Sequence, residues 1–229
     1  MQHTQRPFMT VDSCLVRRGP AIIVLLGKAD CPFMTVESCL VRRGPAIIVL
    51  LGEADSEAMQ HTQRPFMTVD SCQVRRGPAI IGLLGEADSE AMQHTQRPFM
   101  TVESCLVRRG PAIIVLLGEA DSEAMQHTQR PFMTVESCQV RRGLATIGLL
   151  GEADSEAMQH TQRPFMTVES CQVRRGPATI GLLGEADSEA MQHTQRPFMT
   201  VDSCPVRRGP AIIVLLRKAH SKAMQHTQR

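Results

Sequence analysis

Polar and apolar residues alternate over nine positions, then a charged turn and an unbroken apolar run follow, and this pattern recurs every 33 residues. In the copy from Met92 to Ala124, the residues from Phe99 to Val107 read FMTVESCLV. Polar residues interleaved with Val, Thr and Phe predict a half-buried strand. The next four residues, RRGP, predict a turn, because glycine tolerates unusual dihedral angles and proline fixes φ.

The second half of the unit predicts a second strand and a helix. Ala112 to Leu117 reads AIIVLL, and this uncharged run with three β-branched residues favours a strand that is buried on both faces. The sequence EADSEAMQHTQRP then predicts a short helix that is capped by Asp121 or Ser122 and ends before Pro131. The predicted fold class is therefore an α/β tandem repeat of strand, turn, strand and short helix.

The strict period divides the chain of 229 residues into repeats that are too short to fold alone. A unit of 33 residues lies below the roughly 40 residues that an unstapled domain needs, so the units must stack into a solenoid. The alternative is a largely disordered or aggregation-prone chain, because uncharged AIIVLL segments without proline can pair with one another. The repeats span residues 1–31, 32–58, 59–91, 92–124, 125–157, 158–190 and 191–223, and a partial repeat covers 224–229.

Differences between the copies suggest how the gene arose. Gln at the fifteenth position of the unit always accompanies Gly at the twenty-fourth, as in Gln73 and Gly82, which indicates that two variants were copied as blocks. If the twenty-fourth position is buried, replacing Val with Gly costs on the order of 2 kcal/mol. We therefore expect residues 125–190, which also carry Thr146 and Thr179, to be the least stable part of the chain.

These differences favour one functional hypothesis and leave a second open. The first is a tandem-repeat product of low sequence complexity without a dedicated biochemical activity, translated from an open reading frame over a minisatellite. The second is a repeat scaffold that binds a protein or a polyanion. The junction between repeats 1 and 2 also lacks the eight residues EAMQHTQR, which shortens repeat 1 at its end and repeat 2 at its start and should leave a gap in a packed stack.

The sequence offers no pattern that predicts an enzyme, a cofactor site or a metal site. Each full unit has one His and one Cys ten residues apart, such as His61 and Cys72, and no CxxC pair is present. Zinc sites need four ligands with closer spacing. The glycines around Gly82 lack the GK[ST] ending of a phosphate-binding loop, and no GxSxG motif occurs. We expect free thiols that can cross-link on oxidation, and Cys31 lies at the deletion.

Neither a signal peptide nor a membrane span is predicted. The apolar run from Ala21 to Gly27 has seven residues, whereas a spanning helix needs about 18 or more. We therefore expect no membrane insertion, and no cellular location can be assigned. The same AIIVLL runs make self-association through strand pairing a further expectation.

The strongest interaction signal is an arginine pair in every repeat. In a regular stack the pairs would form a basic ridge that can bind a polyanion, whereas the simpler interpretation is a solvated turn. The seventh repeat is also basic, with Arg217, Lys218, His220 and Lys222 in place of Gly and acidic residues, which indicates drift or attraction to phosphate. The candidate anion contacts are Arg17, Arg18, Arg42, Arg43, Arg75, Arg76, Arg108, Arg109, Arg141, Arg142, Arg174, Arg175, Arg207 and Arg208.

Overall fold

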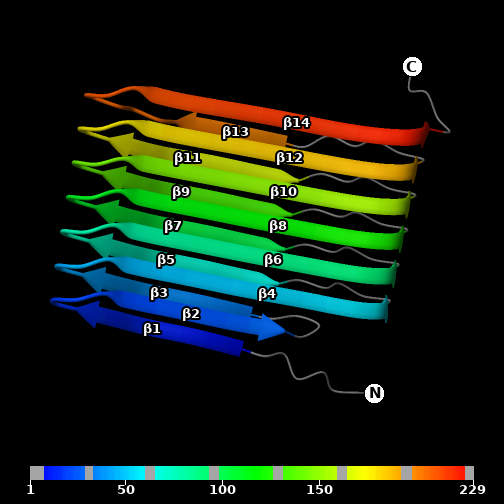
Figure 1. Cartoon of the computed structure of the whole chain (residues 1–229), viewed down its shortest axis with the longest axis horizontal. Coiled ribbons are helices and arrows are strands. Elements are labelled where there is room, and N and C mark those ends of the chain that lie inside the picture. The colour runs from blue at the N-terminus through cyan, green and yellow to red at the C-terminus, as the bar shows by residue number, and fades with distance from the viewer. Residues whose placement is uncertain are drawn as a thin grey trace.

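The chain forms a β-solenoid in which each repeat contributes one coil of two strands (Figure 1). The structure is a computed structural model and describes residues 8–28, 33–59, 65–92, 98–125, 131–158, 164–191 and 198–224. Fourteen strands in these ranges make two parallel sheets of seven strands each. The predicted stack of repeats is therefore confirmed, as an all-β solenoid.

The two sheets separate the two strands of each coil. The first sheet contains β1 (Phe8–Val16), β3 (Phe33–Val41), β5 (Phe66–Val74), β7 (Phe99–Val107), β9 (Phe132–Val140), β11 (Phe165–Val173) and β13 (Phe198–Ser203). The second sheet contains β2 (Ala21–Lys28), β4 (Ala46–Met59), β6 (Ala79–Met92), β8 (Ala112–Met125), β10 (Ala145–Met158), β12 (Ala178–Met191) and β14 (Ala211–Met224).

Residues that pair between neighbouring coils occupy equivalent positions of their repeats. Phe99 pairs with Phe132 in the first sheet, and Ala112 pairs with Ala145 in the second. The phenylalanine rings stack along the axis with centroids 4.6–4.9 Å apart, which measures the rise from one coil to the next. This rise equals the spacing of hydrogen-bonded strands.

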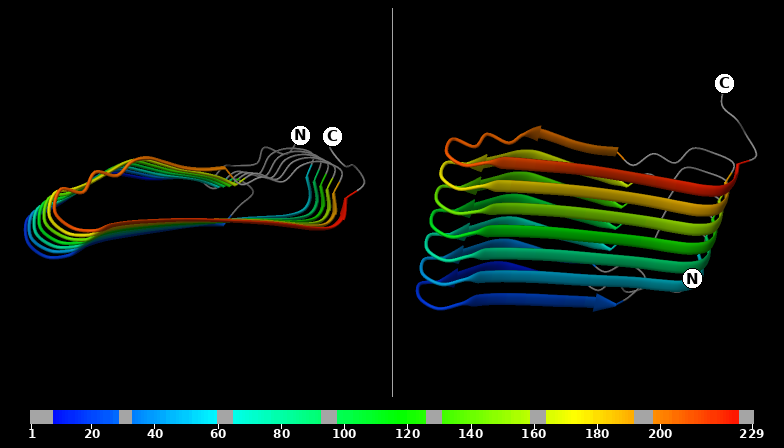
Figure 2. Two further views of the ribbon diagram at one scale, coloured as in Figure 1. Left: turned by 90° about the horizontal axis from the view of Figure 1, so that it is seen from above. Right: turned by 45° about the horizontal axis from the view of Figure 1, so that its top comes forward.

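The core lies between the two sheets and runs through the whole stack. Alternate side chains of each strand point inward, as with Met100 and Val102 from β7 and Ile114 and Leu116 from β8, which are all fully buried. Cys105 joins them from the first sheet. Viewed from above, each coil is flattened, and the two layers face each other across this narrow interior (Figure 2).

The prediction of a short helix after the apolar run is wrong for the residues that the structure describes. Glu119 to Met125 continue β8, with Asp121 paired to Asp154 and Ser122 to Ser155. A helix of two or three turns must nucleate at a cost, whereas a strand already begun gains ladder hydrogen bonds to both neighbouring coils. The rest of the predicted helix, residues 126–130, lies outside the described residues.

The apolar run is buried on only one face, contrary to our expectation. Ile114 and Leu116 are fully buried, whereas Val115 between them is 36% exposed. The outer face of the second sheet is therefore apolar and open in the coils that carry Val.

The substitutions that distinguish the copies lie outside the core, so our expectation that packing forbids them is wrong. A Cβ atom built on Gly82, Gly148 or Gly181 would meet no atom within 4 Å. Gln73, Gln139 and Gln172 are exposed, and Thr146 and Thr179 alternate with buried neighbours. These copies keep the buried Ile and Leu of the other coils, so the reason to expect low stability in residues 125–190 disappears.

The eight-residue deletion leaves both ladders in register. Phe8 still pairs with Phe33, and Ala21 still pairs with Ala46. The second strand of the first coil, β2, is instead shorter than the 14-residue strands above it. The deletion therefore shortens the coil at the end away from the arginine turn, and it does not interrupt the ladders of the stack.

The helix content of the described ranges is zero, so they contain no helix long and apolar enough to cross a membrane.

Candidate anion-binding groove

The arginine pair of each repeat lies at the turn that joins the two sheets. The predicted turn is confirmed: the chain bends at Arg-Arg-Gly, and the glycine has a positive φ, 139° at Gly110. A Cβ on Gly110 would collide with the carbonyl oxygen of Gly77 in the preceding coil. Only glycine allows the turns to approach each other this closely.

Backbone hydrogen bonds carry the ladder through the turn. The Arg108 nitrogen donates to the Val74 oxygen at 2.9 Å, and the Gly110 nitrogen donates to the Arg142 oxygen at 3.0 Å. Equivalent bonds recur from coil to coil. The arginine backbones are therefore fixed at the coil spacing, about 4.8 Å, by the same ladder that holds the strands.

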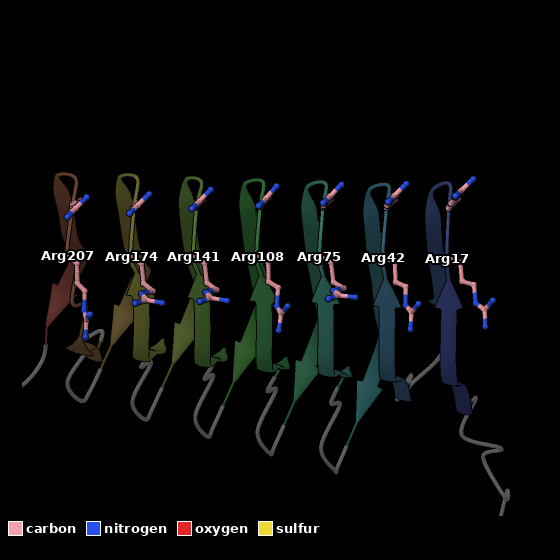
Figure 3. A pocket seen from close by; sticks show the side chains of 14 residues that line it. Arg17, Arg42, Arg75, Arg108, Arg141, Arg174 and Arg207 are labelled. Atoms are coloured by element: carbon pink, nitrogen blue, oxygen red, sulfur yellow. The ribbon is translucent and has the colours of Figure 1, made fainter.

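All fourteen candidate arginines line one groove, which has a volume of about 820 Å³. Figure 3 shows them as two rows that run across the coils, with Arg17, Arg42, Arg75, Arg108, Arg141, Arg174 and Arg207 labelled as the first members of their pairs. Among the residues that the structure describes, the groove lining contains no acidic and no aromatic residue. The structure thus brings together all fourteen arginines that the sequence predicted as anion contacts. Their contact with an anion stays a prediction.

The groove gathers fourteen positive side chains in a chain whose net charge is only +2. Two guanidinium groups per coil give one charge for about every 2.4 Å of the axis. Two like charges at the coil spacing repel by roughly 1 kcal/mol in water before screening by salt. The geometry therefore favours counter-anions in the groove.

The cysteines form a second ladder, which lies in the core. Cys39, Cys72, Cys105, Cys138 and Cys171 are buried, and Cys14 and Cys204 at the ends of the row are half-buried. All seven are free thiols. Cys31 lies outside the described residues.

Hydrogen bonds between neighbouring thiols set their acidity. The bond to Cys72, with burial, raises the pKa of Cys39 far above its ordinary value. Bonds from Cys105 and Cys39 lower the pKa of Cys72 to about 4, against the opposing effect of burial. The pKa of Cys105 is raised by its bonds to Cys138 and Cys72. The direction of the pKa shift therefore alternates from Cys39 to Cys171.

No metal-binding group of three or more His, Cys, Asp or Glu residues occurs in the described part of the chain. His61 and its counterparts at the third position of the other repeats lie outside the described residues, so the structure does not place the His and Cys pairs considered above.

Two acidic rows were not predicted from the sequence. Glu103 is exposed and lies in a row with Asp70 and Glu136, and slight desolvation followed by the charges of these two neighbours raises its pKa. In the second sheet, Glu53 and Glu185 end a row of glutamates, and each is paired with a lysine of the adjoining terminal coil. The strict period was the available signal, because it implies that identical charges stack.

Comparison with protein families, with known proteins and with solved structures finds no match to this chain.

Proposed function

We propose that this protein is a repeat scaffold that binds a linear polyanion along the arginine groove, through the phosphate groups of the ligand. The observation that supports this proposal is the lining of one continuous groove by fourteen arginines from seven coils. Guanidinium groups form bidentate, charge-assisted hydrogen bonds with phosphate oxygens.

The spacing of charge favours phosphate chains over acidic polypeptides. The groove offers one positive charge for about every 2.4 Å, and a single nucleic-acid strand carries one phosphate for about every 3.4 Å. An extended polypeptide presents side chains on one face only every second residue, or about every 6.6 Å. A phosphate chain therefore neutralises more of the groove per unit length.

The groove favours recognition of backbone charge rather than of bases. Proteins that hold single strands by their bases stack the bases on aromatic side chains, and the described part of the groove lining has no aromatic residue. Binding should accordingly be insensitive to nucleotide sequence and strongly dependent on salt.

The test measures binding of the full chain to three fluorescent probes of equal total charge: inorganic polyphosphate, a DNA single strand and polyglutamate. We expect both phosphate probes to bind more tightly than polyglutamate. The relative affinities of polyphosphate and DNA identify the source of the phosphate. Tighter binding of polyglutamate would indicate an acidic protein partner and would overturn the proposal.

A matched pair of variants tests whether the groove is responsible. The triple variant Arg75→Gln, Arg108→Gln, Arg141→Gln removes three charges from the groove, and the control Lys28→Gln, Lys218→Gln, Lys222→Gln removes three lysine charges while all fourteen groove arginines stay. We expect the groove variant to reduce the slope of log affinity against log salt by about 2, because each phosphate contact contributes about 0.7–0.9. Equal losses in both variants would show nonspecific attraction.

The second candidate is a tandem-repeat product without a dedicated activity, and the linked Gln and Gly positions favour it as a record of block duplication. The coding DNA separates the two. Copies that are nearly identical at silent positions favour recent duplication, whereas many silent changes beneath a preserved protein sequence favour selection on the protein.

A further inference from the structure

The two ends of a solenoid are surfaces onto which another coil can add. At the C-terminal end, Ile213 and Leu215 occupy inward positions of β14, yet they are 47% and 44% exposed. Their counterparts in the middle coils, such as Ile114 and Leu116, are fully buried. An uncovered core beside an unpaired strand edge is a template for another chain. The partner that fits this surface is the N-terminal coil of a second copy, because it carries the same repeat.

We infer that the seventh coil is a cap against such head-to-tail addition, and that Arg217 is its central residue. Arg217 replaces a glycine that stands at the same position of all six preceding repeats. In the middle coils this glycine lies between its own coil and the next: a Cβ on Gly118 would approach Cε of Met100 in the same coil to 2.9 Å and Cβ of Pro131 in the next coil to 3.1 Å. A side chain at this position therefore occupies the place that the next coil would fill.

Arg217 also takes a hydrogen-bond acceptor at the open edge. Its Nη2 donates to the carbonyl oxygen of Met199 at 3.3 Å. The Phe198 nitrogen of the last coil donates to the Pro164 oxygen of the preceding coil. The Pro164 carbonyl therefore points toward the C-terminal end of the stack. Carbonyls two residues apart on a strand point to the same side. Met199 lies two residues beyond the proline of the last repeat that corresponds to Pro164, so the Met199 carbonyl also points toward the open end. Arg217 thus binds an acceptor that an added strand would use.

A further residue of the last coil opposes addition. Lys218 pairs with Glu185 at 2.7 Å, and in a continued ladder its other register partner would be Lys28 of the second copy. Like charges would then meet at the junction.

The test compares two variants that differ only at position 217. Arg217→Gly with Lys218→Glu restores the residues of the middle coils, whereas Arg217→Gln with Lys218→Glu makes the same change of charge but keeps a side chain at the blocked position. Sedimentation velocity across a concentration series, with circular dichroism as the control for folding, measures assembly. We expect the glycine variant to form filaments at a concentration at least tenfold below that of the glutamine variant or the unchanged chain.

The unchanged chain serves as a second probe. Its N-terminal coil can add to a growing filament of the glycine variant, but its own cap then stops growth, so a small proportion of it should shorten the filaments seen by electron microscopy. Disordered aggregates of a misfolded variant would not be shortened. The inference is overturned if the glycine variant stays monomeric, if the glutamine variant assembles equally, or if the unchanged chain fails to shorten the filaments.

Discussion

Val49 and Gly82 are register partners on neighbouring strands of the second sheet, and the space beside the Gly82 Cα is open to solvent. Replacing Val with Gly would disrupt a core, but at this position it changes only the outer surface of the sheet. The adjacent inward residues, Ile48 and Ile81, are identical and fully buried. Variation between these copies follows the face of the sheet, as selection for a folded solenoid would leave it.

The outward and inward positions of the apolar run should differ sharply in their tolerance of threonine. Two copies carry Thr at the position equivalent to Ile113, and none carries it at the position of Ile114. We expect Ile113→Thr to change the free energy of unfolding by less than about 1 kcal/mol. Ile114→Thr should cost about 2–4 kcal/mol, because it buries a hydroxyl and removes packing. Urea denaturation measures both, and equal costs would place the two side chains in similar surroundings.

Alternation made part of the fold predictable. The residues of β7 were identified from the sequence because polar residues mark its outer face. The run AIIVLL has no polar residue to mark either face, so its one-sided burial could not be read from the pattern. The extension of β8 to Met125 was missed because helix caps and strand residues compete locally, whereas the ladder to the neighbouring coils decides the outcome.

The candidate groove was predictable in composition but not in its surroundings. A strict period implies that Arg108 and Arg141 stack, and their hydrogen-bonded turns confirm that register. The role of Arg217 depends on the contact between one glycine and a proline of the next coil, such as Gly118 and Pro131. Those residues are 13 positions apart along the chain, and no local signal in the sequence links them.

Hydrogen exchange should identify the C-terminal coil, rather than residues 125–190, as the least protected part of the stack. The inward side chains of β14 are half-exposed, whereas Ile147 and Leu149 of β10 are buried as completely as those of β8. Because each coil is stabilised by its neighbours, an end coil opens more easily. We expect protection factors in β10 to equal those in β8 within about tenfold and to exceed those in β14. Weaker protection in β10 than in β14 would contradict this packing.

The contribution of Glu103 to stability should fall as pH rises from 4.5 toward neutral. The pKa of Glu103 is raised above its ordinary value of 4.5, so the folded chain binds this proton more tightly than the unfolded chain does. The folded state then gains stability as the group is protonated and loses it as pH rises through the raised pKa. Glu103→Gln should reduce this dependence, and Arg43→Gln serves as a control outside the acidic row. Thermal denaturation across this pH range measures the effect, and an unchanged slope in Glu103→Gln would contradict it.

Thiol modification should separate the end cysteines from those in the core. Cys14 and Cys204 are half-buried, and the five thiols between them are buried. We expect iodoacetamide to label the end pair more than about a hundredfold faster at pH 8, since a local opening free energy of about 3 kcal/mol gives that factor. Mass spectrometry of the digested chain measures the rates, and the same digest after labelling in urea gives the reference. Uniform labelling of all seven without denaturant would show that the core is open.

Multivalent anions should stabilise the fold beyond the effect of ionic strength. Stacked guanidinium groups repel one another along the groove, and an anion that bridges two coils removes this cost only in the folded state. We expect the melting temperature to be higher in phosphate than in chloride at equal ionic strength. A ligand at about 100 times its Kd contributes roughly 2.7 kcal/mol. The variant with Arg75, Arg108 and Arg141 replaced by Gln should lose most of the difference between the salts. Phosphate also stabilises proteins generally by exclusion from their surface, so the same gain in that variant would trace the effect to the solvent and not to the groove.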